Sequence, residues 1–125
     1  MNPSWYLPRV LPPPLEGLAE LALDLRWTWN HDVDRLWRAL DPAQWEATGN
    51  PWAVLEGAPQ RHLEALAQDP DFIQTLTAQL NARRAHLRER TWFEAEPSRA
   101  GLGAVAYFSM EFGLTEALPI YSGGL

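Results

Sequence analysis

Two Asp-Pro pairs constrain the fold of this sequence, because each fixes the start of a helix. In Asp41-Pro42 and Asp69-Pro70 the aspartate suits the position before a helix, where its carboxylate accepts hydrogen bonds from unpaired amides. Proline suits the first helical turn, because it has no amide hydrogen to leave unpaired there. Gln44 follows Asp41 at the spacing of a capping box. The chain is therefore expected to fold largely as helices.

Hydrophobic spacing in the first half of the chain supports this prediction. Residues 15–29 carry apolar side chains at steps of three and four, which predicts one amphipathic helix. Its expected inward stripe is Leu15, Leu18, Ala22, Leu25 and Trp29. Asp32 is expected to cap a helix over residues 33–40, and Gly49-Asn50-Pro51 to end the helix that begins at Pro42. Residues 52–58 fit either a short turn of helix or a loop.

Two further helices are predicted before the composition changes. Residues 59–68 predict a helix with Leu63, Leu66 and Ala67 inward. Residues 71–90 predict the longest helix, whose apolar side carries Phe72, Ile73, Leu76, Leu80 and Leu87. The polar, breaker-rich segment 94–103 then marks a boundary. We therefore expect a helical accessory domain over residues 1–99 and the start of a different domain over residues 100–125.

The second domain is expected to begin with a β-strand. Residues 104–110, Ala-Val-Ala-Tyr-Phe-Ser-Met, form a compact apolar run, and its length and flanking glycines favour a buried strand over a helix. A strand without polar alternation needs cover on both faces, as in a parallel α/β sheet. The predicted fold class is therefore mainly α, with the first strand of a truncated α/β domain at its end.

Charge and composition exclude several classes of function. The formal net charge of -6 disfavours binding to nucleic acid or an anionic membrane. The absence of cysteine excludes disulfides and thiolate metal sites. The histidines at 31, 62 and 86 lack metal-binding spacing, so no metal is expected. With neither a signal peptide nor an apolar run long enough to span a membrane, the protein is expected to be cytoplasmic.

The end of the chain carries the most specific motifs. The blocks Tyr-Phe-Ser-Met-Glu-Phe-Gly-Leu (107–114) and Leu-Pro-Ile-Tyr-Ser-Gly-Gly-Leu (118–125) resemble the start of the catalytic domain of the α-glucan phosphorylases. Residues 18–30 and 36–51 resemble the helical N-terminal extension of the bacterial and archaeal branch of that family. The resemblance implies an N-terminal fragment of a glycosyltransferase of glycogen and maltodextrin metabolism, with two Rossmann-like domains.

The resemblance also implies a reaction and its site. Such enzymes cleave α-1,4-glucan ends with inorganic phosphate to give glucose 1-phosphate, using pyridoxal phosphate bound to a lysine. The loop corresponding to Gly123, Gly124 and Leu125 would lie over the sugar and phosphate, with its amides facing the anion. Glu111 would support this loop, or else be a surface carboxylate at a strand end. All ten basic residues of this chain are arginine, so the cofactor lysine is absent.

The absence of the cofactor lysine limits what the chain is expected to do alone. It holds no catalytic residue, binds no cofactor and is expected to be inactive, either as a truncated piece or as a partial gene product. A glycogen or starch synthase is a weaker alternative, because that class typically places a lysine where Tyr121 and Ser122 stand. A stand-alone helical module that binds glucan or protein is the other alternative. Packing on the catalytic domain, or self-association through the edge of strand 104–110, is expected.

The aromatic and basic clusters each leave two interpretations. Five of the seven tryptophans lie between residues 27 and 52, and they either fill a small helical core or form a platform for sugar rings. The core is preferred for most of them, and Trp27 is the candidate for sugar stacking because it lies off the inward stripe. The arginines at 83, 84, 88 and 90 either bind phosphate or an acidic partner, or complement the helix C-terminus on a solvated face; the latter is preferred.

Overall fold

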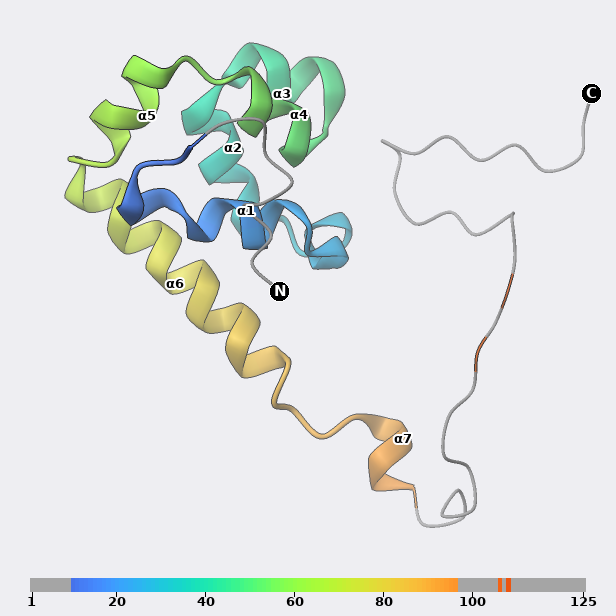
Figure 1. The fold of residues 1–125 in the computed structure, drawn as a ribbon. Coiled ribbons are helices and arrows are strands. Elements are labelled where there is room, and N and C mark those ends of the chain that lie inside the picture. Colours follow the sequence, from blue (N-terminus) through green and yellow to red (C-terminus); the bar gives the residue numbers. More distant parts are fainter. Residues whose placement is uncertain (1–9, 97–105, 107, 109–125) are drawn as a thin grey trace, which may run out of the picture.

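The structure, a computed structural model, describes residues 10–96, 106 and 108. Its elements follow one another in short steps (Figure 1), and they are η2 (Pro13–Leu15), α1 (Gly17–Ala22), η3 (Leu25–Thr28), η4 (His31–Val33), α2 (Asp34–Leu40), α3 (Pro42–Thr48), α4 (Pro51–Gly57), α5 (Gln60–Leu66), α6 (Pro70–His86) and α7 (Trp92–Ala95). The elements labelled η are 3-10 helices. The prediction of a mainly helical fold is confirmed, and no strand occurs among the described residues.

The Asp-Pro pairs start helices as predicted. Asp41 accepts a hydrogen bond from the amide of Gln44 at 2.9 Å at the start of α3. Asp69 accepts from the amides of Asp71 and Phe72 at the start of α6. Asn50 caps α4 in the same way, which resolves residues 52–58 as helix rather than loop. Gly49 ends α3 in the left-handed conformation, with φ of 53°.

The predicted helix over residues 15–29 is wrong beyond Ala22. The chain leaves the helix at Leu23, and the Asp24 carboxylate caps the new 3-10 turn η3 by accepting from the Arg26 amide. This break changes the direction in which later side chains point, so Leu25 is 43% exposed and Trp29 65% exposed. The proposed cap Asp32 is also wrong, because Asn30 caps η4 and no side chain caps α2.

One hydrophobic core holds the helices together. Its buried residues extend from Leu11 to Leu76 and include Trp37 and Trp45. Phe72 and Leu76 of α6 are buried as predicted, and Ile73 and Leu80 pack partly against the core. Leu87 is 65% exposed, because α6 ends at His86 rather than near residue 90. Leu63 and Leu66 of α5 are buried as predicted.

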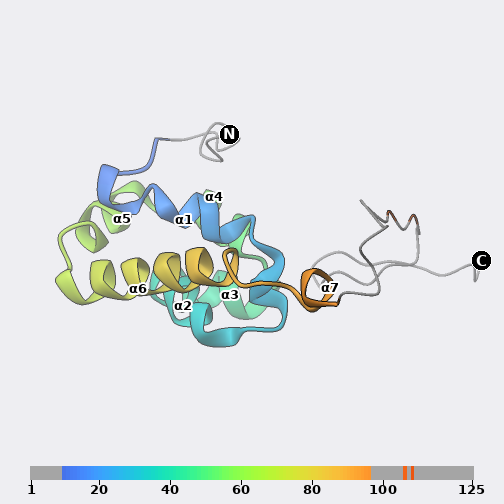
Figure 2. The same ribbon diagram turned by 90° about the horizontal axis from the view of Figure 1, so that it is seen from below.

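The longest helix, α6, runs along α1, and the two have the same direction. Gly17 at the start of α1 lies against Leu80, so closely that a Cβ atom there would meet the Leu80 side chain below contact distance. Glu20 pairs with Arg83 one turn further along both helices. Helix α7 lies apart from the other helices, beyond the C-terminal end of α6 (Figure 2). None of the helices in the described part of the chain is long and apolar enough to cross a membrane.

Candidate functional site

Four of the predicted site residues lie outside the described residues. These are Glu111 and the loop residues Gly123, Gly124 and Leu125. The predicted strand 104–110 and the domain boundary near residue 99 also lie there, except that Ala106 and Phe108 are described and have no regular secondary structure. The candidate site that the structure can test is therefore the tryptophan cluster around η3.

The tryptophans divide into buried, intermediate and exposed positions. Trp37 and Trp45 are buried, while Trp27 and Trp52 pack partly against the core. The core interpretation is therefore confirmed for Trp37 and Trp45, Trp52 lies at the edge of the core, and the sugar-stacking candidate Trp27 is half-buried. Trp29 was expected in the core but is largely exposed, whereas Trp27 contacts Trp45 edge to face at 6.5 Å between ring centroids. That contact covers part of the Trp27 ring and fixes its orientation.

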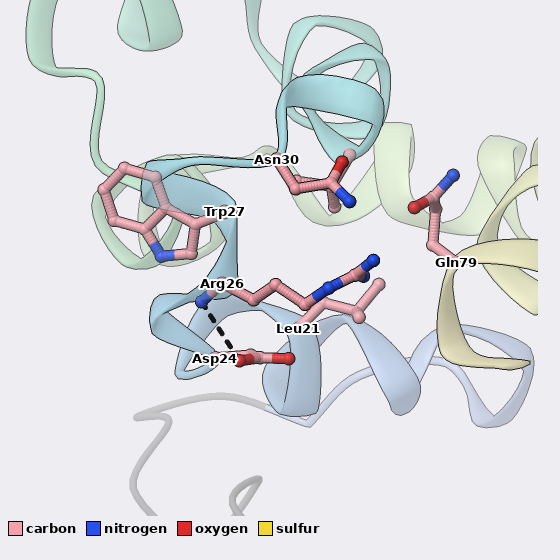
Figure 3. Close-up of a pocket in the computed structure, with 7 residues that line it drawn as sticks. Leu21, Asp24, Arg26, Trp27, Asn30 and Gln79 are labelled. Carbon is pink, nitrogen blue, oxygen red and sulfur yellow. Dashed lines mark hydrogen bonds between the residues drawn. The ribbon is translucent and has the colours of Figure 1, made fainter. Parts of the chain in front are cut away.

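A shallow hollow with about 20 Å³ of enclosed space, open to solvent on one side, lies beside Trp27 (Figure 3). It is lined by Leu21, Asp24, Arg26, Trp27, Asn30, Val33 and Gln79. Asp24, Arg26 and Trp27 come from the break after α1 and from η3. The others come from α1, from the start and end of η4, and, for Gln79, from α6. The Arg26 side chain extends between Asn30 and Leu21, and its guanidinium end points toward Gln79 (Figure 3). The hollow therefore combines an indole wall with a guanidinium, two amides and a carboxylate.

Several polar groups of the hollow already hold the backbone in place. The Asp24 Oδ1 atom accepts from the Arg26 amide at 3.1 Å, and the Asn30 Oδ1 atom accepts from the Asp32 amide at 3.1 Å. These bonds leave the Asn30 NH2 group and the Arg26 guanidinium as donors that face the hollow. Gln79 is only 9% exposed, so its amide is positioned by packing rather than by solvent. The hollow can therefore hold a small polar ligand rich in oxygen atoms.

Arg83 lies behind the hollow and pairs with two carboxylates of α1 and its C-terminal break. Its Nη1 atom donates to Glu20 Oε1 at 2.6 Å. Its Nε atom lies 2.8 Å from Asp24 Oδ2, an ion pair that is not aligned as a hydrogen bond. The three side chains are only 22% to 29% exposed. The expectation that Arg83 lies on a solvated face is therefore wrong.

Sequence reasoning missed Arg26 and Gln79, and it placed Arg83 on a solvated face. A signal for the last two was present, because Gln79 follows Leu76 by three positions and Arg83 follows Leu80 by three. Polar residues on the inward side of an amphipathic helix have to find partners or line a cavity. No signal marked Arg26, because the break of α1 at Leu23 decides where it points.

The titratable groups do not form a catalytic or metal centre among the described residues. No group of three histidine or carboxylate side chains there could hold a metal ion. The histidines have individual contacts: His31 Nδ1 lies 3.4 Å from Asp34 Oδ2, His62 Nε2 lies 2.8 Å from the Ala39 carbonyl, and His86 Nδ1 lies 3.3 Å from Glu89 Oε2. Hydrogen bonds from the backbone and side chain of Thr91 lower the pKa of Glu94, which belongs to the capping box of α7. These contacts are structural.

Comparisons with known proteins place these residues in a family. Maltodextrin phosphorylase from Thermococcus litoralis is 38% identical over 116 residues, which is 92% of this chain and 14% of that protein. Glycogen phosphorylase from Mycobacterium tuberculosis is 38% identical over 122 residues, with coverages of 92% and 14%. Glycogen phosphorylase from Aquifex aeolicus is 33% identical over 111 residues, with coverages of 88% and 15%. The chain thus spans 14% to 15% of the length of these curated relatives.

The relatives confirm the resemblance to α-glucan phosphorylases that the sequence motifs indicated. No solved structure matches the chain. The family described as "Protein of unknown function (DUF3417)" matches residues 11–118, which include the core, η3 and the hollow. Since this match covers most of the sequence, the chain belongs to the DUF3417 family.

Proposed function

We propose that this chain is the helical N-terminal part of an α-1,4-glucan phosphorylase. That enzyme would cleave glucan ends with inorganic phosphate and release glucose 1-phosphate in glycogen or maltodextrin metabolism. The observation that carries the proposal is the 38% identity to a maltodextrin phosphorylase over 92% of the chain. The helices would serve to position the catalytic domains rather than to react.

Pyridoxal phosphate does not fit the residues of this chain. A phosphorylase of this class would hold the cofactor through a lysine amine, and all ten basic residues here are arginine. The cofactor would therefore be bound by other parts of the enzyme. The contribution proposed for this chain to the reaction site is the loop of Gly123, Gly124 and Leu125, whose amides would face the substrate phosphate, with Glu111 supporting the loop.

The test compares this chain with the full gene product that contains it. Each is incubated with maltoheptaose and inorganic phosphate, and glucose 1-phosphate is measured. We expect release by the full product that depends on phosphate, and none by the 125-residue chain. A full product that releases free glucose without phosphate, or that extends glucan from a nucleotide sugar, would contradict the proposal in favour of a hydrolase or a synthase.

A second candidate function is the binding of an α-glucan end at the hollow beside Trp27. The hollow's donors and acceptors suit sugar hydroxyl groups, and an indole face suits the C–H surface of a pyranose ring. The enclosed space of the hollow is only about 20 Å³, so a sugar ring would lie across its open side rather than inside it. Asp24 is paired with Arg83, so the Arg26 guanidinium is the charged donor left for sugar hydroxyl groups.

Tryptophan fluorescence tests this second candidate. Titration of the chain with maltoheptaose should give a saturable change, and a β-linked glucan should give none. Arg26→Ala and Gln79→Leu should abolish the change, while Trp92→Phe should keep it, because Trp92 lies in α7, away from the hollow. An equal response to both glucans, or no response in a folded sample, would assign the tryptophans to packing alone.

A further inference from the structure

We propose that one end of the helical bundle is a docking surface for the polypeptide that follows residue 96, beginning with the apolar run 104–110. The surface, here called the η3 face, consists of Leu23, Leu25, Trp29 and Leu87. The inference rests on the proposed function, since it takes the following polypeptide to be the α/β part of the phosphorylase.

The exposed apolar side chains of the bundle gather at this end. Leu23 is 50% exposed, Leu25 43%, and Trp29 and Leu87 65% each. The other large apolar side chains exposed among the described residues are Val10, Trp92 of α7 and Phe108. Single exposed apolar residues are ordinary on a soluble protein, but a group of them on one end marks an interaction surface.

The parallel run of α1 and α6 brings the two parts of the η3 face together. Gly17 contacts Leu80, and Glu20 pairs with Arg83, so residues 63 positions apart lie side by side. Arg83 also pairs with Asp24, so the last turn of α6 reaches the segment that follows α1. The light-blue segment after α1 and the C-terminal end of α6 both lie at the end of the bundle that faces α7 (Figure 2).

The charges between α1 and α6 at this end do not oppose burial. Arg83 is paired with both Glu20 and Asp24, so covering the surface leaves none of these three groups without a counter-charge. Burying an unpaired charge would cost several kcal/mol, and this arrangement avoids it. The η3 face is therefore apolar in its side chains and neutral in the cluster beneath them.

The chain's own continuation is the occupant that best fits this surface. Helix α7 ends at Ala95, so the run 104–110 follows within a few residues, and such a short link gives a high effective concentration. One family match covers residues 11–118, so the η3 face and the apolar run belong to the same family unit. The described residue Phe108 is 93% exposed, which leaves an aromatic side chain of that run available for burial.

Hydrogen–deuterium exchange tests the docking in the full gene product. Compared with the full product that carries Trp29→Ser, amides of residues 23–30 and 87–92 in the unaltered full product should exchange about tenfold more slowly or slower still, as expected when interface side chains of this size are buried. Val10→Ser is the matched control and should leave the slow exchange unchanged, because Val10 is also exposed but lies before η2 in the sequence. Circular dichroism of both variants checks that they fold.

Two results would overturn the docking. One is equal exchange in the full product and in its Trp29→Ser variant; the other is protection that disappears on dilution, which would assign the η3 face to contact with a second copy. Phosphorolysis is measured separately on the same samples. An active full product with an unprotected face refutes docking alone, and a protected face in an inactive product refutes the proposed function alone.

Discussion

Arg83 balances the charges of Glu20 and Asp24 where α6 contacts α1. Replacing it by methionine, Arg83→Met, keeps much of the apolar stem but leaves Glu20 and Asp24 largely buried without a counter-charge. We expect a loss of about 1–3 kcal/mol in the free energy of unfolding, between the values for exposed and buried pairs. Urea unfolding followed by tryptophan fluorescence measures it.

Arg84→Met is the matched control, because Arg84 is exposed in the same turn of α6. This substitution should change the free energy of unfolding by no more than about 0.5 kcal/mol. Equal losses for the two variants would show that the loss of charge at the helix end, and not the pairing with Glu20 and Asp24, causes the effect of Arg83→Met.

Glu94 gives α7 a dependence on pH. Its carboxylate accepts from the amide and the hydroxyl of Thr91 at 2.8 Å each, and these bonds lower its pKa from the ordinary value of 4.5. A lowered pKa means that the ionised form is favoured in the folded chain, so the cap is intact above 4.5 and is lost as pH falls through the lower folded value. The Thr91 amide resonance should titrate with a midpoint below 4.5.

The Glu94→Gln variant separates this titration from other effects of acid. Glutamine can keep the capping box without a charge, so the Thr91 resonance should no longer move over the same range. A midpoint at or above 4.5 in the unaltered chain would contradict the capping geometry.

At the scale of elements, the end of α3 depends on Gly49. Its φ of 53° is left-handed, and a Cβ atom added there would meet nothing within 4 Å. Gly49→Ala should therefore destabilise the fold only through backbone strain, by about 1 kcal/mol. Gly57→Ala, at the end of α4, has equal space and no positive φ, so it should be neutral or stabilise by up to about 1 kcal/mol. In thermal unfolding, Gly49→Ala should lower the melting temperature, and Gly57→Ala should leave it unchanged or raise it. If both variants lowered it equally, the left-handed turn at Gly49 would be contradicted.

The contact between Gly17 and Leu80 can be tested by a double-mutant cycle. Gly17→Ala should destabilise by about 1–3 kcal/mol, because the new methyl group collides with Leu80. In a Leu80→Ala background the collision is gone, so the same change should be neutral or favourable through its helix propensity. Urea unfolding of the unaltered chain, the two single variants and the double variant gives the coupling energy between positions 17 and 80. Additive effects of the two substitutions would mean that α1 and α6 do not approach as described.

Features that depend on neighbouring residues, such as helix caps, were predicted well from the sequence. Features that depend on contacts between distant elements were missed. Asp41 and Asp69 were predicted as caps because a cap contacts residues two or three positions away. Trp29 was placed inward by periodicity, but the Asp24 carboxylate stops the helix and turns the chain. Of the candidate site, Trp27 was predicted, while Gln79 was missed because it reaches the hollow from α6, far away in sequence. The loop at Gly123 and Gly124 stays a prediction.

At the scale of the whole molecule, residues 10–96 should fold without the rest of the chain. The buried core described for the structure runs from Leu11 to Leu76, so deletion of residues 97–125 removes none of it. We expect the shortened chain to unfold cooperatively and to keep the same helical circular dichroism per molecule. Shortening to residues 10–69 should abolish cooperative unfolding, because it removes Phe72 and Leu76. Loss of cooperativity in the 10–96 chain would show that the core extends further.

The parallel packing of α1 and α6 has a consequence for how the chain folds during synthesis. Helices α2, α3 and α4 pack with near neighbours in sequence, and such local contacts form in microseconds to milliseconds. A ribosome adds only about 5–20 residues per second, so these helices can pack long before α6 emerges. The ion pair between Glu20 and Arg83 joins residues 63 positions apart, so it cannot form before α6 has emerged. A nascent chain therefore remains open along α1 until α6 is released, and closes last at the end from which the rest of the polypeptide continues.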